Sequence, residues 1–206
     1  EVVWILKDLC KRQQWNSYSN LNYGTKYAIN IVASMIPIGV VGVFFKDDIE
    51  AIFGSGTTVV GIMLLVTSAL LIFSFYAKPR QKENISLGHA FIIGLSQALA
   101  VLPGLSRSGT TIAAGLTIGL EKEFAAKFSF ILSIPAILGA AVFQLKDLSG
   151  GSIEIGACIA GFVVAAISGY LAISFLLKIV REKSLDIFAY YCWIVGIIVL
   201  IGSLIL

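Results

Sequence analysis

Residues 97–111 read QALAVLPGLSRSGTT, and they interrupt a membrane-like helix with a proline, a glycine and an arginine. It lies inside an apolar segment, residues 85–120, that is interrupted by Pro103-Gly104 and by Arg107. A helix needs about 20 apolar residues to cross a bilayer, and neither half of the segment is long enough. At membrane depth a charge costs on the order of 2.5–3.5 kcal/mol, and non-helical backbone survives only where protein or water covers it. We therefore predict a re-entrant pair of half-helices that enters and leaves the membrane on one side.

The composition agrees with a membrane protein. The 206 residues are 58% hydrophobic and only 13% charged, whereas soluble domains are about one quarter charged. The long uncharged runs predict an all-α, multi-pass helical bundle that forms one membrane domain over residues 1–206. We expect crossings at about residues 28–45, 57–77, 128–145, 155–177 and 187–206. The charged run between the first two, residues 46–50, is expected to be a loop.

Lysine and arginine residues predict the orientation, because short cytoplasmic loops carry an excess of them. If residues 85–120 return to their own side, one side holds Lys46 and Lys146. The other side holds Lys7, Lys11, Arg12, Lys26, Lys78, Arg80, Lys82, Lys122, Lys127, Lys178, Arg181 and Lys183. We expect this second side to be cytoplasmic. If residues 85–120 crossed the membrane completely, these lysine and arginine residues would lie on both sides. The charge pattern therefore independently favours re-entrance.

The break in the helix has the chemistry of a phosphate site. Ser106 is a good N-cap for the second half-helix, whose start offers free backbone N–H groups and the positive end of the helix dipole. Arg107 adds a planar charged fork that matches phosphate oxygens. Thr111 follows four residues later and therefore shares a helix face with Arg107. The alternative is a solvated loop with Arg107 as an interfacial anchor, but the apolar flanks make an unpaired arginine costly there.

Other polar residues are weaker candidates. Gln97 either faces the same cavity or packs between helices, and His89, the single histidine, is expected at the membrane interface. Glu123 and Lys127 are spaced for an ion pair on a helix. No carboxylate pair lies at membrane depth, so we expect no metal ligands within this chain. Three widely spaced cysteines suggest neither a disulfide nor a metal site, and a net charge of +3 does not suggest nucleic acid.

The motif also carries a resemblance. The run from Pro103 to Thr111, with Gln97 before it, resembles the second signature of the undecaprenyl-diphosphate phosphatase family of bacterial inner membranes. Residues 128–135, FSFILSIP, resemble that family's next helix, and Lys78-Pro79 also fits. The resemblance implies a fold of two inverted repeats, each with a re-entrant hairpin, and an active site that faces the periplasm.

The resemblance further implies hydrolysis of undecaprenyl diphosphate to undecaprenyl phosphate and inorganic phosphate, which recycles the carrier lipid for cell-wall synthesis. The catalytic positions would be Ser106, Arg107 and Thr111. The residues expected to bind substrate beside them are Gln97, Gly104, Ser108, Gly109 and Thr110. Ser106 is either a nucleophile or a group that caps the helix while water attacks.

One departure from the family concerns its first repeat. The family's Glu-x-x-x-Glu motif and Ser-Ser-x-Gly-His stretch do not occur in these residues. Residues 2–6 are apolar and end at Lys7, which suggests the tail of a helix that begins before Glu1. We therefore expect an N-terminal region to supply the carboxylates for a divalent cation, Mg²⁺ or Ca²⁺, and expect this chain alone to be inactive.

Two rival functions remain open at the level of sequence. Broken helices whose N-termini face an anionic substrate also occur in transporters, so the chain could move a phosphorylated polyprenyl lipid across the membrane. A purely structural membrane subunit would leave Arg107 unexplained. The oligomeric state, with a homodimer as one option, is not fixed by these patterns.

Overall fold

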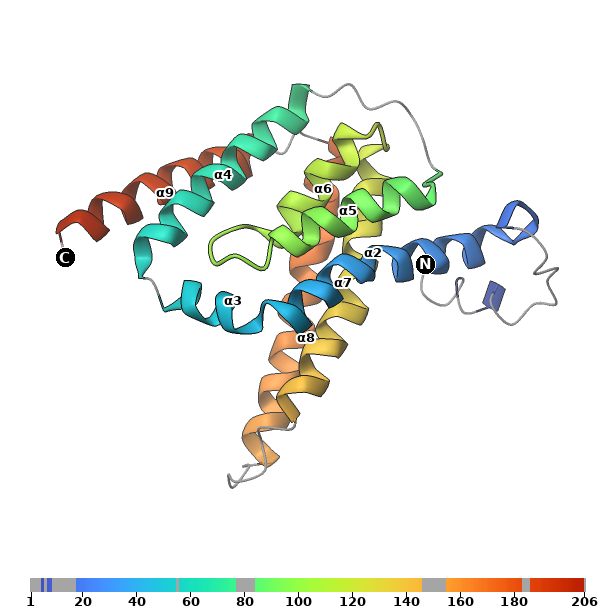
Figure 1. Ribbon diagram of the computed structural model, residues 1–206, viewed down its shortest axis with the longest axis horizontal. Coiled ribbons are helices and arrows are strands. Elements are labelled where there is room, and N and C mark those ends of the chain that lie inside the picture. Colours follow the sequence, from blue (N-terminus) through green and yellow to red (C-terminus); the bar gives the residue numbers. More distant parts are fainter. Residues whose placement is uncertain are drawn as a thin grey trace.

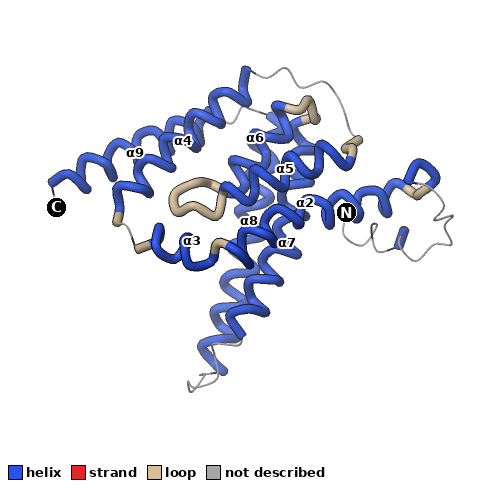
Figure 2. The backbone as a smooth tube through the Cα atoms, in the orientation of Figure 1, coloured by secondary structure: helices blue, strands red, loops and turns tan. Residues whose placement is uncertain are grey.

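The computed structural model describes residues 5, 7, 8, 18–54, 56–76, 84–145, 155–182 and 186–205. These residues form helices and connecting loops (Figure 2), which confirms the all-α prediction. The elements are η1 (Tyr18–Asn20), α2 (Tyr23–Phe44), α3 (Lys46–Phe53), α4 (Thr57–Tyr76), α5 (Leu87–Leu99), α6 (Arg107–Thr117), α7 (Lys122–Leu145), α8 (Ile155–Glu182) and α9 (Asp186–Ile205) (Figure 1). The loops predicted around residues 77–83 and 146–154 lie outside the described residues.

Five helices in the described part of the chain are long and apolar enough to cross a membrane: α2, α4, α7, α8 and α9. Each coincides with a predicted crossing. The helices α2 and α7 begin about five residues earlier than the apolar runs, at Tyr23 and Lys122. A helix can continue past the apolar layer because charged side chains such as Lys26 are tolerated where its end reaches the interface.

The prediction of a loop at residues 46–50 is wrong. This segment is the start of α3, an exposed helix of eight residues. Its acidic residues Asp47 and Asp48 lie in the first turn, where the helix dipole favours negative charge, and Lys46 pairs with Glu50 one turn later at 3.6 Å. The charges that suggested a loop therefore suit a short helix outside the membrane.

Two helix pairs approach closely at glycines. The pair α4 and α9 meets where Gly61 lies under Leu200 and where Gly196 lies against the backbone oxygen of Gly61. The pair α2 and α5 meets at Gly94, where a Cβ would overlap the backbone of Ser34. Small residues let membrane helices pack with their backbones close together.

The buried core lies where α2, α5, α6 and α7 meet. Tyr27 on α2 contacts the rings of Phe124 and Phe128 on α7, at centroid distances of 5.9 and 5.3 Å. Phe128 is fully buried, as are Ile112 of α6 and Ile93 of α5. In contrast, α8 exposes large apolar side chains such as Phe162 along its length, as expected of a helix that faces lipid.

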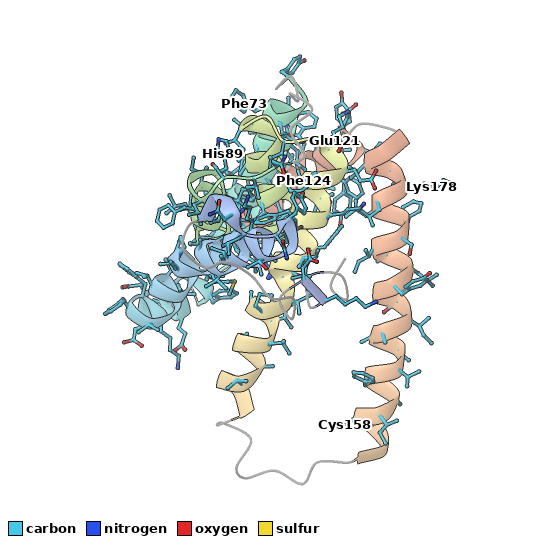
Figure 3. All side chains as sticks on the ribbon, turned by 90° about the vertical axis from the view of Figure 1, so that its right-hand side faces the viewer. Phe73, His89, Glu121, Phe124, Cys158 and Lys178 are labelled. Atoms are coloured by element: carbon cyan, nitrogen blue, oxygen red, sulfur yellow. The ribbon has the colours of Figure 1, made fainter. Side chains whose placement is uncertain are left out.

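The helices α5 and α6 form the predicted hairpin. They pack against each other and are joined by residues 100–106 (Figure 2). His89 in the first turn of α5 and Glu121 just after α6 lie at the same end of the molecule as Lys178, whereas Cys158 lies at the opposite end (Figure 3). Both outer ends of the hairpin therefore lie on the side of Lys178, one of the basic residues that the charge pattern assigns to the cytoplasmic side.

Candidate functional site

The tip of the hairpin is a tight turn against α4. Gly104 has φ +90°, a conformation that glycine adopts without strain. A Cβ at Gly104 would overlap the backbone of Val60 on α4. Pro103-Gly104 thus ends the first half-helix and lets the loop backbone lie directly on its neighbour, with Leu105 buried beside it.

Ser106 begins α6 as its N-cap, as predicted. Its backbone is extended, and its Oγ accepts a hydrogen bond from the amide of Gly109 at 3.2 Å. Its carbonyl accepts the first helical hydrogen bond, from the amide of Thr110 at 2.8 Å. Among the described residues, the amides of Arg107 and Ser108 have no protein acceptor, as expected in the first turn of a helix. These two N–H groups are therefore free to bind an anion.

Arg107 is half-buried and leans toward α7. Its Nη2 lies 3.4 Å from the carbonyl oxygen of Ser133, a long hydrogen bond that uses one of the five guanidinium donors. The hydroxyl of Thr111 contacts that of Ser129, also on α7, and lies 2.9 Å from the carbonyl oxygen of Arg107. Arg107 and Thr111 therefore face the same neighbour, which confirms that they share a helix face. The other guanidinium donors have no acceptor within the described ranges and are therefore available to a ligand.

Thr110 and Gln97, both predicted to bind substrate, lie in different surroundings. Thr110 is buried, and its Oγ1 has no protein partner among the described residues. Gln97 is fully buried on α5, and its Nε2 lies 3.8 Å from the sulfur of Met35 on α2. Gln97 thus packs between helices, while its Oε1 has no partner in the part of the chain that the structure describes. Its predicted contact with substrate stays a prediction, as do the roles of Ser108, Gly109 and Gly104.

The hydrogen bond and the ion pair formed by the other polar candidates lie away from the tip of the hairpin, and the side-chain Nδ1 of His89 has no partner among the described residues. His89 lies in the first turn of α5, where its amide donates to the hydroxyl of the N-cap Ser86. Lys127 and Glu123 form the predicted ion pair at 2.9 Å on α7. Neither contact involves the tip of the hairpin.

Three residues that support the site were not singled out from the sequence. Thr67 of α4 accepts a hydrogen bond from the amide of Ser106 at 3.1 Å, and Ser129 and Ser133 of α7 contact Thr111 and Arg107. The one sequence feature that could have indicated these three residues is a polar side chain within an apolar helix. This feature is a weak signal, because such hydroxyls also bond to their own helix.

The described residues do not by themselves fit a divalent cation. Within the described ranges, histidine, cysteine, aspartate and glutamate side chains form no group of three or more that could hold a metal. Hard cations need several oxygen ligands, and the side chains in the first turn of α6 are an arginine and hydroxyls.

Comparison with known proteins identifies the chain's relatives. The family model described as bacitracin resistance protein BacA matches residues 1–198. The chain belongs to the BacA family. A BacA relative named undecaprenyl-diphosphatase, from Bacteroides fragilis (strain ATCC 25285), is 53% identical over 98% of this chain and 76% of its own length. Another of that name, from Methanothermobacter thermautotrophicus, is 51% identical over 85% of this chain and 99% of its own length.

Proposed function

We propose that the protein hydrolyses undecaprenyl diphosphate to undecaprenyl phosphate and inorganic phosphate. The BacA relatives at about half identity are named for this activity. One structural observation carries the proposal. The capped N-terminus of α6 presents two free amides and a half-buried arginine at the tip of a hairpin inside an apolar molecule. This arrangement suits the charged end of a lipid whose tail is apolar.

The residues of this chain would bind and orient the diphosphate. The N–H groups of Arg107 and Ser108, together with the helix dipole, favour the negative charge. The guanidinium of Arg107 supplies paired donors to phosphate oxygens. Preorganised donors of this kind count most where water is excluded and charge grows in the transition state.

Hydrolysis breaks the bond between the terminal phosphorus and the bridging oxygen, and that oxygen leaves on the lipid monophosphate. The new bond to phosphorus comes either from water or first from Ser106 Oγ, which water then displaces. Among the described residues, no histidine or carboxylate is hydrogen-bonded to Ser106. A serine nucleophile needs such a base, which would have to come from outside the described residues.

The finer features of this function rest on the family resemblance. We propose that the site faces the periplasm of a bacterial inner membrane and that a divalent cation, held by residues outside the described ones, would supply a Lewis acid. The expected cation ligands are carboxylates that the described residues do not supply. The proposed orientation follows from the predominance of lysine and arginine on the other side.

The rival transporter function gains no support from the relatives, and one experiment separates the two. Purified full-length protein in detergent should release one inorganic phosphate from each undecaprenyl diphosphate. Transport needs a sealed membrane, whereas hydrolysis does not. Movement of the lipid across sealed vesicles, with no phosphate released in detergent, would contradict the proposal.

A further inference from the structure

The backbone N–H of Ser106 needs a hydrogen-bond acceptor that its own helix does not supply. In many helices the N-cap amide is satisfied by a Glu or Gln side chain at the third helical position, which reaches back to it. Here that position is Gly109, which has no side chain. A Cβ at Gly109 would lie only 3.0 Å from Ser106 Oγ, so the site leaves little room for a side chain there. The acceptor for the Ser106 amide must therefore come from elsewhere.

Thr67 supplies this acceptor from another helix. Its Oγ1 lies 3.1 Å from the amide nitrogen of Ser106, although the two residues are 39 positions apart. The same oxygen lies 2.9 Å from the carbonyl of Met63 on its own helix and 3.4 Å from that of Gly104. A hydroxyl has one proton and two lone pairs. With its proton donated to Met63, Thr67 keeps a lone pair for the amide of Ser106.

The surroundings hold this contact in place. Thr67 is fully buried, and α4 is fixed by its glycine contacts with α9. The loop backbone at Gly104 lies against Val60, two turns before Thr67 on the same helix. The methyl group of Thr67 would lie 3.6 Å from a Cβ at Gly109. Thr67 therefore contacts the hairpin at Gly104 and Ser106 and leaves little space beside Gly109.

We propose that Thr67 is a positioning residue for hydrolysis of the lipid diphosphate. It fixes the extended backbone of Ser106 and so aims the next two amides and Arg107 at the phosphate. The proposal rests on the proposed function of the α6 N-terminus. The partly buried amide of Ser106, left without Thr67, would pair with another acceptor or with water, and the first turn of α6 would shift with it. Misplacement of catalytic groups by about 1 Å can cost a hundredfold in rate.

The experiment compares Thr67→Val with Thr67→Ser in the purified full-length protein. Valine keeps the shape and removes the acceptor, whereas serine keeps the hydroxyl. Ser68→Ala is the matched control, because Ser68 is the next residue of α4 and its buried hydroxyl bonds to the carbonyl of Ala189 on α9 at 2.8 Å. Phosphate release gives kcat and KM, and hydrogen–deuterium exchange of residues 100–111 reports on the first turn of α6.

We expect Thr67→Val to lower kcat between about tenfold and a hundredfold with little change in KM, and to speed amide exchange in residues 100–111. Thr67→Ser and Ser68→Ala should keep kcat and the rate of amide exchange near the wild-type values. If valine prevents folding, Thr67→Cys, with a weaker acceptor, should lower kcat in part. Wild-type kcat in the Val or Cys variant would overturn the inference, as would equal losses in Thr67→Val and Ser68→Ala. An inactive wild-type protein would instead overturn the proposed function itself.

Discussion

Among single residues, Ser106 has both a structural role and a place beside the proposed phosphate-binding groups. It caps α6, and it lies next to the amides and the arginine that face the expected phosphate. Replacement by alanine removes the cap and should lower the free energy of unfolding by about 1 kcal/mol, whereas glycine should cost only a few tenths. Thermal unfolding in detergent measures both changes.

The activity of the same two variants separates the roles of Ser106. If Oγ is the nucleophile, turnover is lost in both. If Oγ only caps the helix, Ser106→Gly keeps more turnover than Ser106→Ala, in the order of their stabilities. This second order is the one we expect, because Oγ is engaged by the amide of Gly109.

The cap and the shared face of Arg107 and Thr111 were predictable from the sequence, since both depend on neighbours within one turn of helix. The contacts with Thr67, Ser129 and Ser133 were not. Each joins residues on different helices, 18 to 39 positions apart. The spacing of residues within one helix does not predict which other helix it will contact. Gln97 illustrates the same limit, because its helix was predictable but the neighbour it faces, α2, was not.

At the scale of elements, the hairpin depends on its tip. Gly104→Ala should destabilise the protein for two reasons, the positive φ and the overlap with Val60. Gly56→Ala is the matched control, because Gly56 has φ +92° with nothing within 4 Å of an added Cβ. The strain of φ alone costs about 1–2 kcal/mol.

The melting temperature in detergent should fall more for Gly104→Ala than for Gly56→Ala. The difference measures the close approach of the loop to α4. Equal losses in the two variants would mean that the tip is not held against α4, and the support from Thr67 would then also be in doubt.

Most elements were predictable because the uncharged runs are long enough to decide them. The helix α3 was not, since residues 46–50 contain four charges and too few apolar positions to show a period. A charged segment between two membrane helices fits a loop and a short surface helix equally well. Its i,i+4 pair and its acidic first turn favour the helix only in hindsight.

At the scale of the whole molecule, the hairpin should leave the membrane on the side where it entered. Single cysteines at Gly88, Lys122 and Asp48, all exposed, report this in a background where the native cysteines are replaced by serine. Gly88 precedes the hairpin tip and Lys122 follows it. An impermeant maleimide applied to intact cells should label Asp48→Cys alone.

After permeabilisation, Gly88→Cys and Lys122→Cys should be labelled as well. Labelling of Gly88→Cys and Lys122→Cys from opposite sides would mean that residues 85–120 cross the membrane, and the re-entrant interpretation would be wrong.

We propose that Arg107, at the capped start of α6, holds the diphosphate during hydrolysis. The most direct test is kcat/KM for phosphate release from undecaprenyl diphosphate by wild-type protein, Arg107→Ala and the control Lys122→Ala, whose side chain is exposed in the first turn of α7. Arg107→Ala should lose at least about a hundredfold, and Lys122→Ala should stay near wild type. Wild-type kcat/KM in Arg107→Ala would contradict the account.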